Sequence, residues 1–208
     1  RLQMYHKKIT AEIEPPPTEL YTDAYRALVP FGKVPALITD IQVNGKPQVF
    51  IESQVIMEYL EDKFPRSPMR PSNAEELATM REITQVNDNY VTQPLTRLFN
   101  LKFRPTGNET QEAARAAAAD LKADLVRVQA LFGKGPYAIG DSLTLADCTL
   151  VPTLHFSSVL AQLLDVPVPF ADLPRLSGWW ALMTQDRNVA TVREEMDASM
   201  QHAHPVAQ

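Results

Sequence analysis

The chain contains a single cysteine, Cys148, among its 208 residues. One cysteine excludes an internal disulfide, which fits a reducing compartment, and we expect a cytoplasmic protein, although a secreted protein without disulfides would look the same. There is no CxxC pair and no Cys/His cluster, so the sequence predicts no metal site. Glycine is also scarce, with seven residues in the chain, which favours a mainly helical fold.

Long apolar runs and an excess of basic residues are both absent. No run approaches the about 20 apolar residues that a membrane-spanning helix needs, so we expect no membrane association. Lys and Arg number 20 against 25 Asp and Glu, which gives a net charge of −5. Such a balance offers no electrostatic footprint for nucleic acid. Hydrophobic residues make up 45% of the chain, which is typical of a globular protein and argues against disorder.

Two kinds of pattern divide the chain. Residues 1–66 mix short β-like runs with short helices, whereas residues 75–208 are almost entirely helical. Residues 67–74 lie in a stretch rich in proline, through which no helix can run because proline lacks a backbone N–H donor. The sequence therefore predicts two domains joined by this linker.

The first part predicts a helix, a strand, a second helix, a β-hairpin and a third helix. The Asn44-Gly45 pair between two β-like runs is a strong hairpin signal. Thr18 is expected to cap the second helix. The predicted elements are a helix end at 1–9, strands at 10–14, 34–39 and 47–51, and helices ending near residues 28 and 64.

The second part predicts five helices. Thr144 and Asp147 have the spacing of a capping box, in which side chains and backbone N–H groups at a helix start bond reciprocally. Cys148 follows at a buried position and is interpreted as unreactive. The helices are expected at 74–103, bent near Pro94, at 109–132, from Thr144, from Pro174, and at 188–200.

Two short segments carry chemistry. In residues 30–39, Pro35 must lie at the start, edge or bulge of a strand because it cannot donate to a sheet. In residues 50–61, Glu52 and Ser53 open a helix whose positive end suits an anion. Glu52 can hold an ammonium group and Ser53 a carboxylate, although a plain capping role for Ser53 is the alternative reading of the sequence alone.

Taken together and in order, these segments resemble the cytosolic glutathione transferase family, in particular its zeta-like and bacterial members. The matching pieces are FGKVPAL, a hairpin with NG, ES followed by VIMEYLEDKFP, a proline-rich linker, and GDSLTLADCTLVP. The resemblance covers nearly the whole chain. It implies an α/β thioredoxin-like N-terminal domain followed by an all-α C-terminal bundle.

The resemblance also implies a ligand, glutathione, and the residues that hold it. Pro35 would follow a cis peptide bond, and Val34 would pair through its backbone with the cysteinyl part. Lys33 would meet the glycyl carboxylate, whereas Glu52 and Ser53 would hold the γ-glutamyl ammonium and carboxylate. The family further implies a homodimer and the transfer of the glutathione thiolate to a small electrophile.

The thiol-activating Ser, Cys or Tyr of the family lies on its first strand or first helix, so the catalytic residue remains unknown here. We expect a further segment to precede Arg1; a degenerate member without glutathione binding is the alternative. Asn87, Tyr90 and Thr92 are expected to contact the electrophile, although Tyr90 suits a core position equally. A non-catalytic interaction module with the same fold is the competing function.

Overall fold

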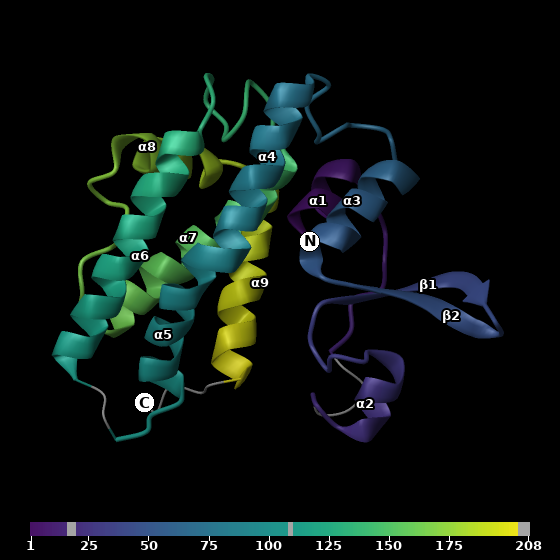
Figure 1. Cartoon of the computed structure of the whole chain (residues 1–208), viewed down its shortest axis with the longest axis horizontal. Helices are drawn as coiled ribbons and strands as arrows, with labels where there is room; N and C mark the ends of the chain where they lie inside the picture. The colour runs from purple at the N-terminus through teal and green to yellow at the C-terminus, as the bar shows by residue number, and fades with distance from the viewer. Residues whose placement is uncertain (16–19, 108–109, 204–208) are drawn as a thin grey trace. The chain divides into compact units, whose positions relative to one another are not determined.

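The computed structural model of the chain describes residues 1–15, 20–107 and 110–203. These residues fall into two compact units, each described by itself below (Figure 1). The mixed unit comprises Gln3–Pro68 and holds the β-hairpin. The helical unit comprises Arg1–Leu2 and the chain from Met69 onward.

The predicted hairpin is confirmed. Strand β1 (Ala36–Val43) pairs antiparallel with β2 (Lys46–Ile51), with a register irregularity in the middle of β1. Asn44 and Gly45 both have positive φ angles, of 52° and 75°. Two such residues form the tight turn whose twist matches that of the flanking strands, so the Asn-Gly pair sets the register of the hairpin.

Three helices accompany the hairpin in the mixed unit: α1 (Leu2–Lys7), which begins in the helical unit, α2 (Asp23–Leu28) and α3 (Ser53–Lys63). The Thr22 hydroxyl caps α2 by accepting a hydrogen bond from the backbone N–H of Tyr25 at 3.3 Å. The expected cap, Thr18, lies outside the described residues.

The strand predicted at residues 10–14 is wrong. These residues are exposed and have no regular secondary structure. Alternation of apolar and polar residues stabilises a strand only where a neighbouring strand supplies hydrogen bonds and one face is buried. Within the part of the chain that the structure describes, β1 pairs with β2 alone.

A buried ion pair links α1 to α3. The Lys7 Nζ atom lies 2.9 Å from Glu61 Oε1, and the two side chains are 0% and 2% exposed. Lys7 also donates to the backbone carbonyls of Arg66 and Ser67, and Gln3 donates to Glu61 at 3.1 Å. This buried polar network fastens the first helix and the end of the mixed unit to α3.

Helix α7 forms the centre of the helical unit, where it contacts α4, α5, α8 and α9 (Figure 1). Most of its side chains are buried, and the predicted helix starts near residues 144 and 174 are confirmed. No helix within the described residues is long and apolar enough to span a membrane. The elements of this unit are α4 (Ala74–Val86), η1 (Asn87–Val91), α5 (Thr92–Phe103), α6 (Gln111–Leu131), α7 (Leu145–Leu163), α8 (Pro174–Met183) and α9 (Arg187–Ala203).

The irregularity predicted near Pro94 is a π turn, η1, between α4 and α5. Pro94 has no N–H to donate to the carbonyl of Tyr90 four residues earlier. The N–H of Thr92 bonds to the carbonyls of both Asn87 and Tyr90 instead. The wider turn therefore satisfies a backbone group that proline would otherwise leave unpaired.

The predicted capping box at the start of α7 is confirmed. Asp147 Oδ2 accepts hydrogen bonds from the N–H and the hydroxyl of Thr144, both at 2.7 Å. Its Oδ1 accepts from the backbone N–H of Ala138 at 2.9 Å and from the indole N–H of Trp179 at 2.6 Å. Burial raises the pKa of Asp147, although each of these hydrogen bonds lowers it. One carboxylate thus joins a helix start, a loop and a helix of the core.

Candidate functional site

A small cavity of about 50 Å³ opens where the loop before β1 meets the start of α3. Such a volume admits one end of a peptide rather than a whole drug-sized molecule. All five residues that the sequence predicts for ligand binding line it. Its lining residues are Val29, Phe31, Lys33, Val34, Pro35, Ile51, Glu52 and Ser53.

The start of α3 forms the polar side of this cavity. The interpretation of Ser53 as the helix cap is wrong: the cap position is Glu52, Ser53 is the first helical residue, and the Glu52 side chain makes no capping bond. The first N–H groups of a helix have no acceptor within it and carry the positive end of its dipole. This end of α3 is therefore suited to a carboxylate.

Glu52 adopts an unusual backbone conformation, with φ of 69° and ψ of 123°. A residue with a side chain in such a region carries strain of about 1–3 kcal/mol and persists only where its surroundings impose it. Here the end of β2 at Ile51 and the start of α3 at Ser53 fix the chain on both sides. The Glu52 side chain is consequently exposed at the cavity and is not used by the helix.

The loop before β1 forms the other side. The Val34–Pro35 peptide bond is cis, as the family resemblance implies. The hydroxyl of Tyr25, a buried residue of α2, donates to the carbonyl of Lys33 at 3.1 Å. Gly32 has a φ of 63°, and a Cβ atom there would approach the backbone of Tyr21 to 3.2 Å. Helix α2 and the turn before it therefore fix the position of this loop.

The cavity offers complementary charged groups that are not used in contacts within the fold. The side chains of Lys33, Glu52 and Ser53 form no hydrogen bond or ion pair with other residues in the described ranges. They supply one cation, one anion and one hydroxyl beside a helix N-terminus. A ligand with two carboxylates and one ammonium group would match this set.

The three residues predicted to contact an electrophile lie on or beside the π turn of the helical unit. Asn87 is buried and its Oδ1 accepts from the Thr153 hydroxyl at 2.9 Å, whereas Tyr90 is 59% exposed. The hydroxyl of Thr92 donates to the carbonyl of Asp88 at 2.7 Å. None of the three lines the α3 cavity or the larger one described next, and their contact with a substrate stays a prediction.

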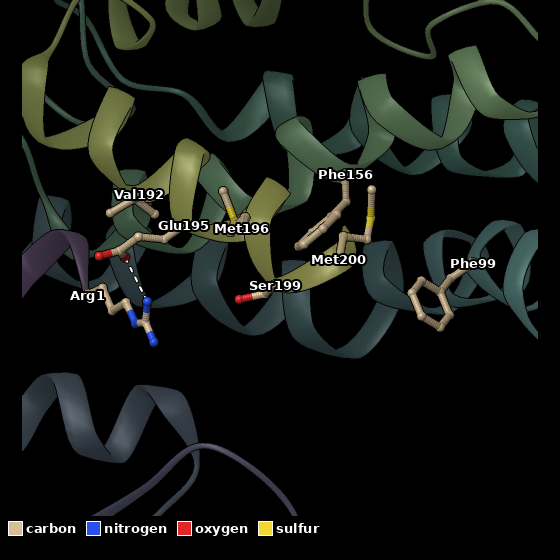
Figure 2. A pocket seen from close by; sticks show the side chains of 8 residues that line it. All are labelled: Arg1, Phe99, Phe156, Val192, Glu195, Met196, Ser199 and Met200. Atoms are coloured by element: carbon tan, nitrogen blue, oxygen red, sulfur yellow. Dashed lines mark hydrogen bonds and ion pairs between the residues drawn. The ribbon is translucent and has the colours of Figure 1, made fainter. Parts of the chain in front are cut away.

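A second cavity, of about 280 Å³, lies within the helical unit between α5, α7 and α9 (Figure 2). Sequence reasoning missed it. In the view of Figure 2, Arg1 and Glu195 lie at one end and Phe99 at the other. Val192, Met196 and Met200 are four residues apart along α9, and this spacing predicts that they share one face of the helix. The lining residues are Arg1, Phe99, Phe156, Val192, Glu195, Met196, Ser199 and Met200.

A buried histidine holds α9, one wall of this second cavity, against α7. His155 Nδ1 accepts from Arg193 Nε at 3.3 Å, so the ring proton is on Nε2, which donates to Asp197 Oδ1 at 2.9 Å. Burial is the main cause that lowers the pKa of His155; Arg193 lowers it further and Asp197 raises it. The neutral ring therefore fits between its two partners.

This arrangement predicts loss of stability in mild acid. The unfolded chain takes up a proton near the ordinary histidine pKa of 6.5, before the folded one does. The free energy of unfolding should therefore fall as the pH drops below that value. The variant H155Q should flatten this dependence, and D197N should steepen it by removing the group that raises the pKa. Urea unfolding from about pH 8 to about pH 5 measures both slopes; equal slopes in all three proteins would contradict the prediction.

Known proteins are similar to this chain in sequence and in fold. The chain is 31% identical over 157 residues to "Probable maleylacetoacetate isomerase 2" of Drosophila melanogaster, covering 73% of this chain and 65% of that protein, just under two thirds of its length. It is 27% identical over 173 residues to a glutathione S-transferase of Pseudomonas putida, covering 82% of this chain and 74% of that protein. The holo structure of maleyl pyruvate isomerase, a bacterial zeta-class enzyme, has a TM-score of 0.71 and 26% identity, covering 91% of this chain and 87% of that one.

Two family models match the chain. The glutathione S-transferase N-terminal domain model matches residues 1–68, and the C-terminal domain model matches residues 111–181. The first range holds the cavity at the start of α3, and the second holds the capping box of α7. The N-terminal model covers the small sheet and its helices, and the C-terminal model covers part of the all-helical region that follows. The chain belongs to the glutathione S-transferase family.

Proposed function

We propose that the chain is a glutathione transferase that binds glutathione at the start of α3 and directs its thiolate to a small apolar electrophile. The observation that carries the proposal is the meeting of Lys33, Val34, Glu52 and Ser53 at one cavity, with the polar side chains among them uncommitted. Membership of the family supports it, as does the name of the Pseudomonas putida relative.

Each charged group of glutathione has a counterpart among the residues around the cavity. The γ-glutamyl ammonium is assigned to the Glu52 carboxylate, and its carboxylate to Ser53 and the N-terminus of α3. The glycyl carboxylate is assigned to Lys33. Val34 is an exposed residue that lines the same cavity, and its backbone is assigned to the cysteinyl part. This assignment places the tripeptide across the opening of the cavity, between the loop before β1 and the start of α3.

Bound glutathione supplies a thiolate, whose sulfur bonds to an electrophilic carbon while the leaving group departs with its electron pair. The chain contributes binding and orientation, which remove translational freedom before the reaction. The names of the maleylacetoacetate isomerase relatives suggest isomerisation as a variant, in which the thiolate would add to the substrate and then leave again, so that no atom is transferred.

We assign the larger cavity of the helical unit to the electrophile. Two phenylalanines, two methionines and a valine dominate its lining. Methionine thioethers adapt to aromatic ligands of different shapes.

The chain is further proposed to be cytoplasmic, to act in detoxification, and to form a homodimer through α3 and α4. Light scattering checks the dimer: a one-chain mass would contradict it.

The binding assignment is tested by two substitutions. Glu52→Ala and Ser53→Ala should each weaken glutathione binding about tenfold, because each removes a hydrogen bond to a charged group. Isothermal titration with glutathione measures the affinities, and retention on immobilised glutathione with a thiol-conjugation assay tests the activity.

Glu12→Ala is the matched control, because Glu12 is exposed in an irregular segment and loses the same charge. Its glutathione affinity should equal that of the unmodified chain. Equal affinity in the Glu52 and Ser53 variants would disprove the assignment. Absence of any glutathione binding or retention would instead support an interaction module.

A further inference from the structure

The larger cavity has charge at one end only. Arg1 Nη1 lies 2.9 Å from Glu195 Oε2 at that end, and five apolar side chains make up most of the remaining lining (Figure 2). The two charges belong to residues that both line the cavity, so a bound ligand would meet the pair rather than a free guanidinium. The lining side chains therefore carry no net charge.

We propose that Glu195 determines the charge selectivity of this cavity: by neutralising Arg1 it makes the cavity select uncharged ligands over dicarboxylates. Identifying that ligand as the electrophile rests on the proposed function, whereas the selectivity itself does not. Glu195 is thus a specificity-determining residue.

The cost of removing a carboxylate from water explains why the cavity favours uncharged ligands. A carboxylate that leaves water for an apolar cavity needs an uncompensated cation to offset the loss of hydration. Glu195 lies 2.9 Å from Arg1 and offsets its charge, and the two side chains are 28% and 42% exposed, so a bound anion meets a neutral, partly solvated pair. Phe99 and Met200 also lie near the C-terminal ends of α5 and α9, where the negative end of each helix dipole opposes a bound anion.

The position of Glu195 is set by the rest of α9. Two residues further along, Asp197 is bonded to His155 of α7, and Arg193 is bonded to the same ring. The guanidinium of Arg193 also lies 5.4 Å from the centre of the Trp180 ring. Arg193 is therefore already engaged away from the cavity lining, and the helix that carries Glu195 is held in one orientation.

Binding titrations of the full chain test the proposal without requiring turnover. The probes are dinitrobenzene, uncharged and unreactive toward thiols under the assay conditions, and maleate. The unmodified chain should bind dinitrobenzene more than tenfold tighter than maleate. Glu195→Gln should tighten maleate binding about tenfold, as expected for loss of one nearby negative charge, and change dinitrobenzene binding less than twofold.

Two further variants make the result specific. Glu194→Gln, the same change at the exposed neighbouring residue, should leave both affinities unchanged. The double variant R1Q/E195Q should lose the gain in maleate affinity, because the freed guanidinium is then absent. Maleate binding equal to that of dinitrobenzene in the unmodified chain, or equal gains from the two glutamate variants, would overturn the proposal. A separate titration with glutathione tests the proposed function, and its failure would leave these ratios interpretable.

Discussion

Replacement of Asp147 with alanine is expected to lower the free energy of unfolding by about 3–5 kcal/mol. The buried carboxylate accepts four hydrogen bonds, from Thr144, Ala138 and Trp179. Alanine would leave the indole N–H and two backbone N–H groups buried without acceptors, at about 1–3 kcal/mol for each group that water cannot reach. The N-cap residue Thr144 would remain, so only the Asp147 half of the capping box would be lost.

Urea or guanidinium unfolding followed by circular dichroism measures this loss. Asp141→Ala is the matched control, because Asp141 is exposed a few residues earlier in the same segment. The control should change the free energy of unfolding by less than about 0.5 kcal/mol. A loss below about 1 kcal/mol for Asp147→Ala would show that water or a rearranged loop replaces the carboxylate.

The ion pair of α1 and α3 gives the second large effect. Lys7→Met should lower the free energy of unfolding by about 3–5 kcal/mol, because it leaves the Glu61 carboxylate buried without its cation. The carbonyls of Arg66 and Ser67 would lose a donor as well. Gln3 would still donate to Glu61 at 3.1 Å, so the expected loss comes from the missing cation.

A double variant distinguishes the cost of an unpaired charge from the value of the pair. K7M/E61L replaces both partners with apolar side chains of similar size, which is often close to neutral for a buried ion pair. Gln3 keeps its second acceptor, the carbonyl of Met57 at 2.8 Å. The double variant should therefore be more stable than K7M alone by chemical denaturation, and losses that simply add would refute this explanation.

Features set by neighbouring residues were predictable from the sequence. The Asn44-Gly45 turn and the Thr144 capping box depend on residues within a few positions, so their residue types identify them. The meeting of Lys33 with Glu52 was also predictable, because a two-stranded hairpin returns the chain to its start. In the structure β1 begins at Ala36 and its pairing partner is Ile51, which places both ligand-binding segments at the same end of the hairpin.

Features that depend on distant partners were not predictable. Residues 10–14 alternate like a strand, but no local property shows whether another strand pairs with them. The cap position at Glu52 rather than Ser53 follows from a backbone turn with positive φ, which is uncommon for glutamate. The larger cavity requires Phe99, Phe156 and Met200 from three helices to meet, and their spacing in the sequence does not show this.

The π turn of Asn87–Val91 affects the directions in which the side chains of the following helix, α5, point. Each residue of an α-helix advances the side-chain direction by about 100°. The wider π turn advances less per residue, so deleting one of its residues and restoring ordinary winding would leave the direction of Phe99 almost unchanged. Deleting one residue from the ordinary α-helix between the turn and Phe99 would instead swing Phe99 by about that angle around the axis. The turn therefore accommodates one residue of extra length without turning Phe99 away from the cavity that it lines.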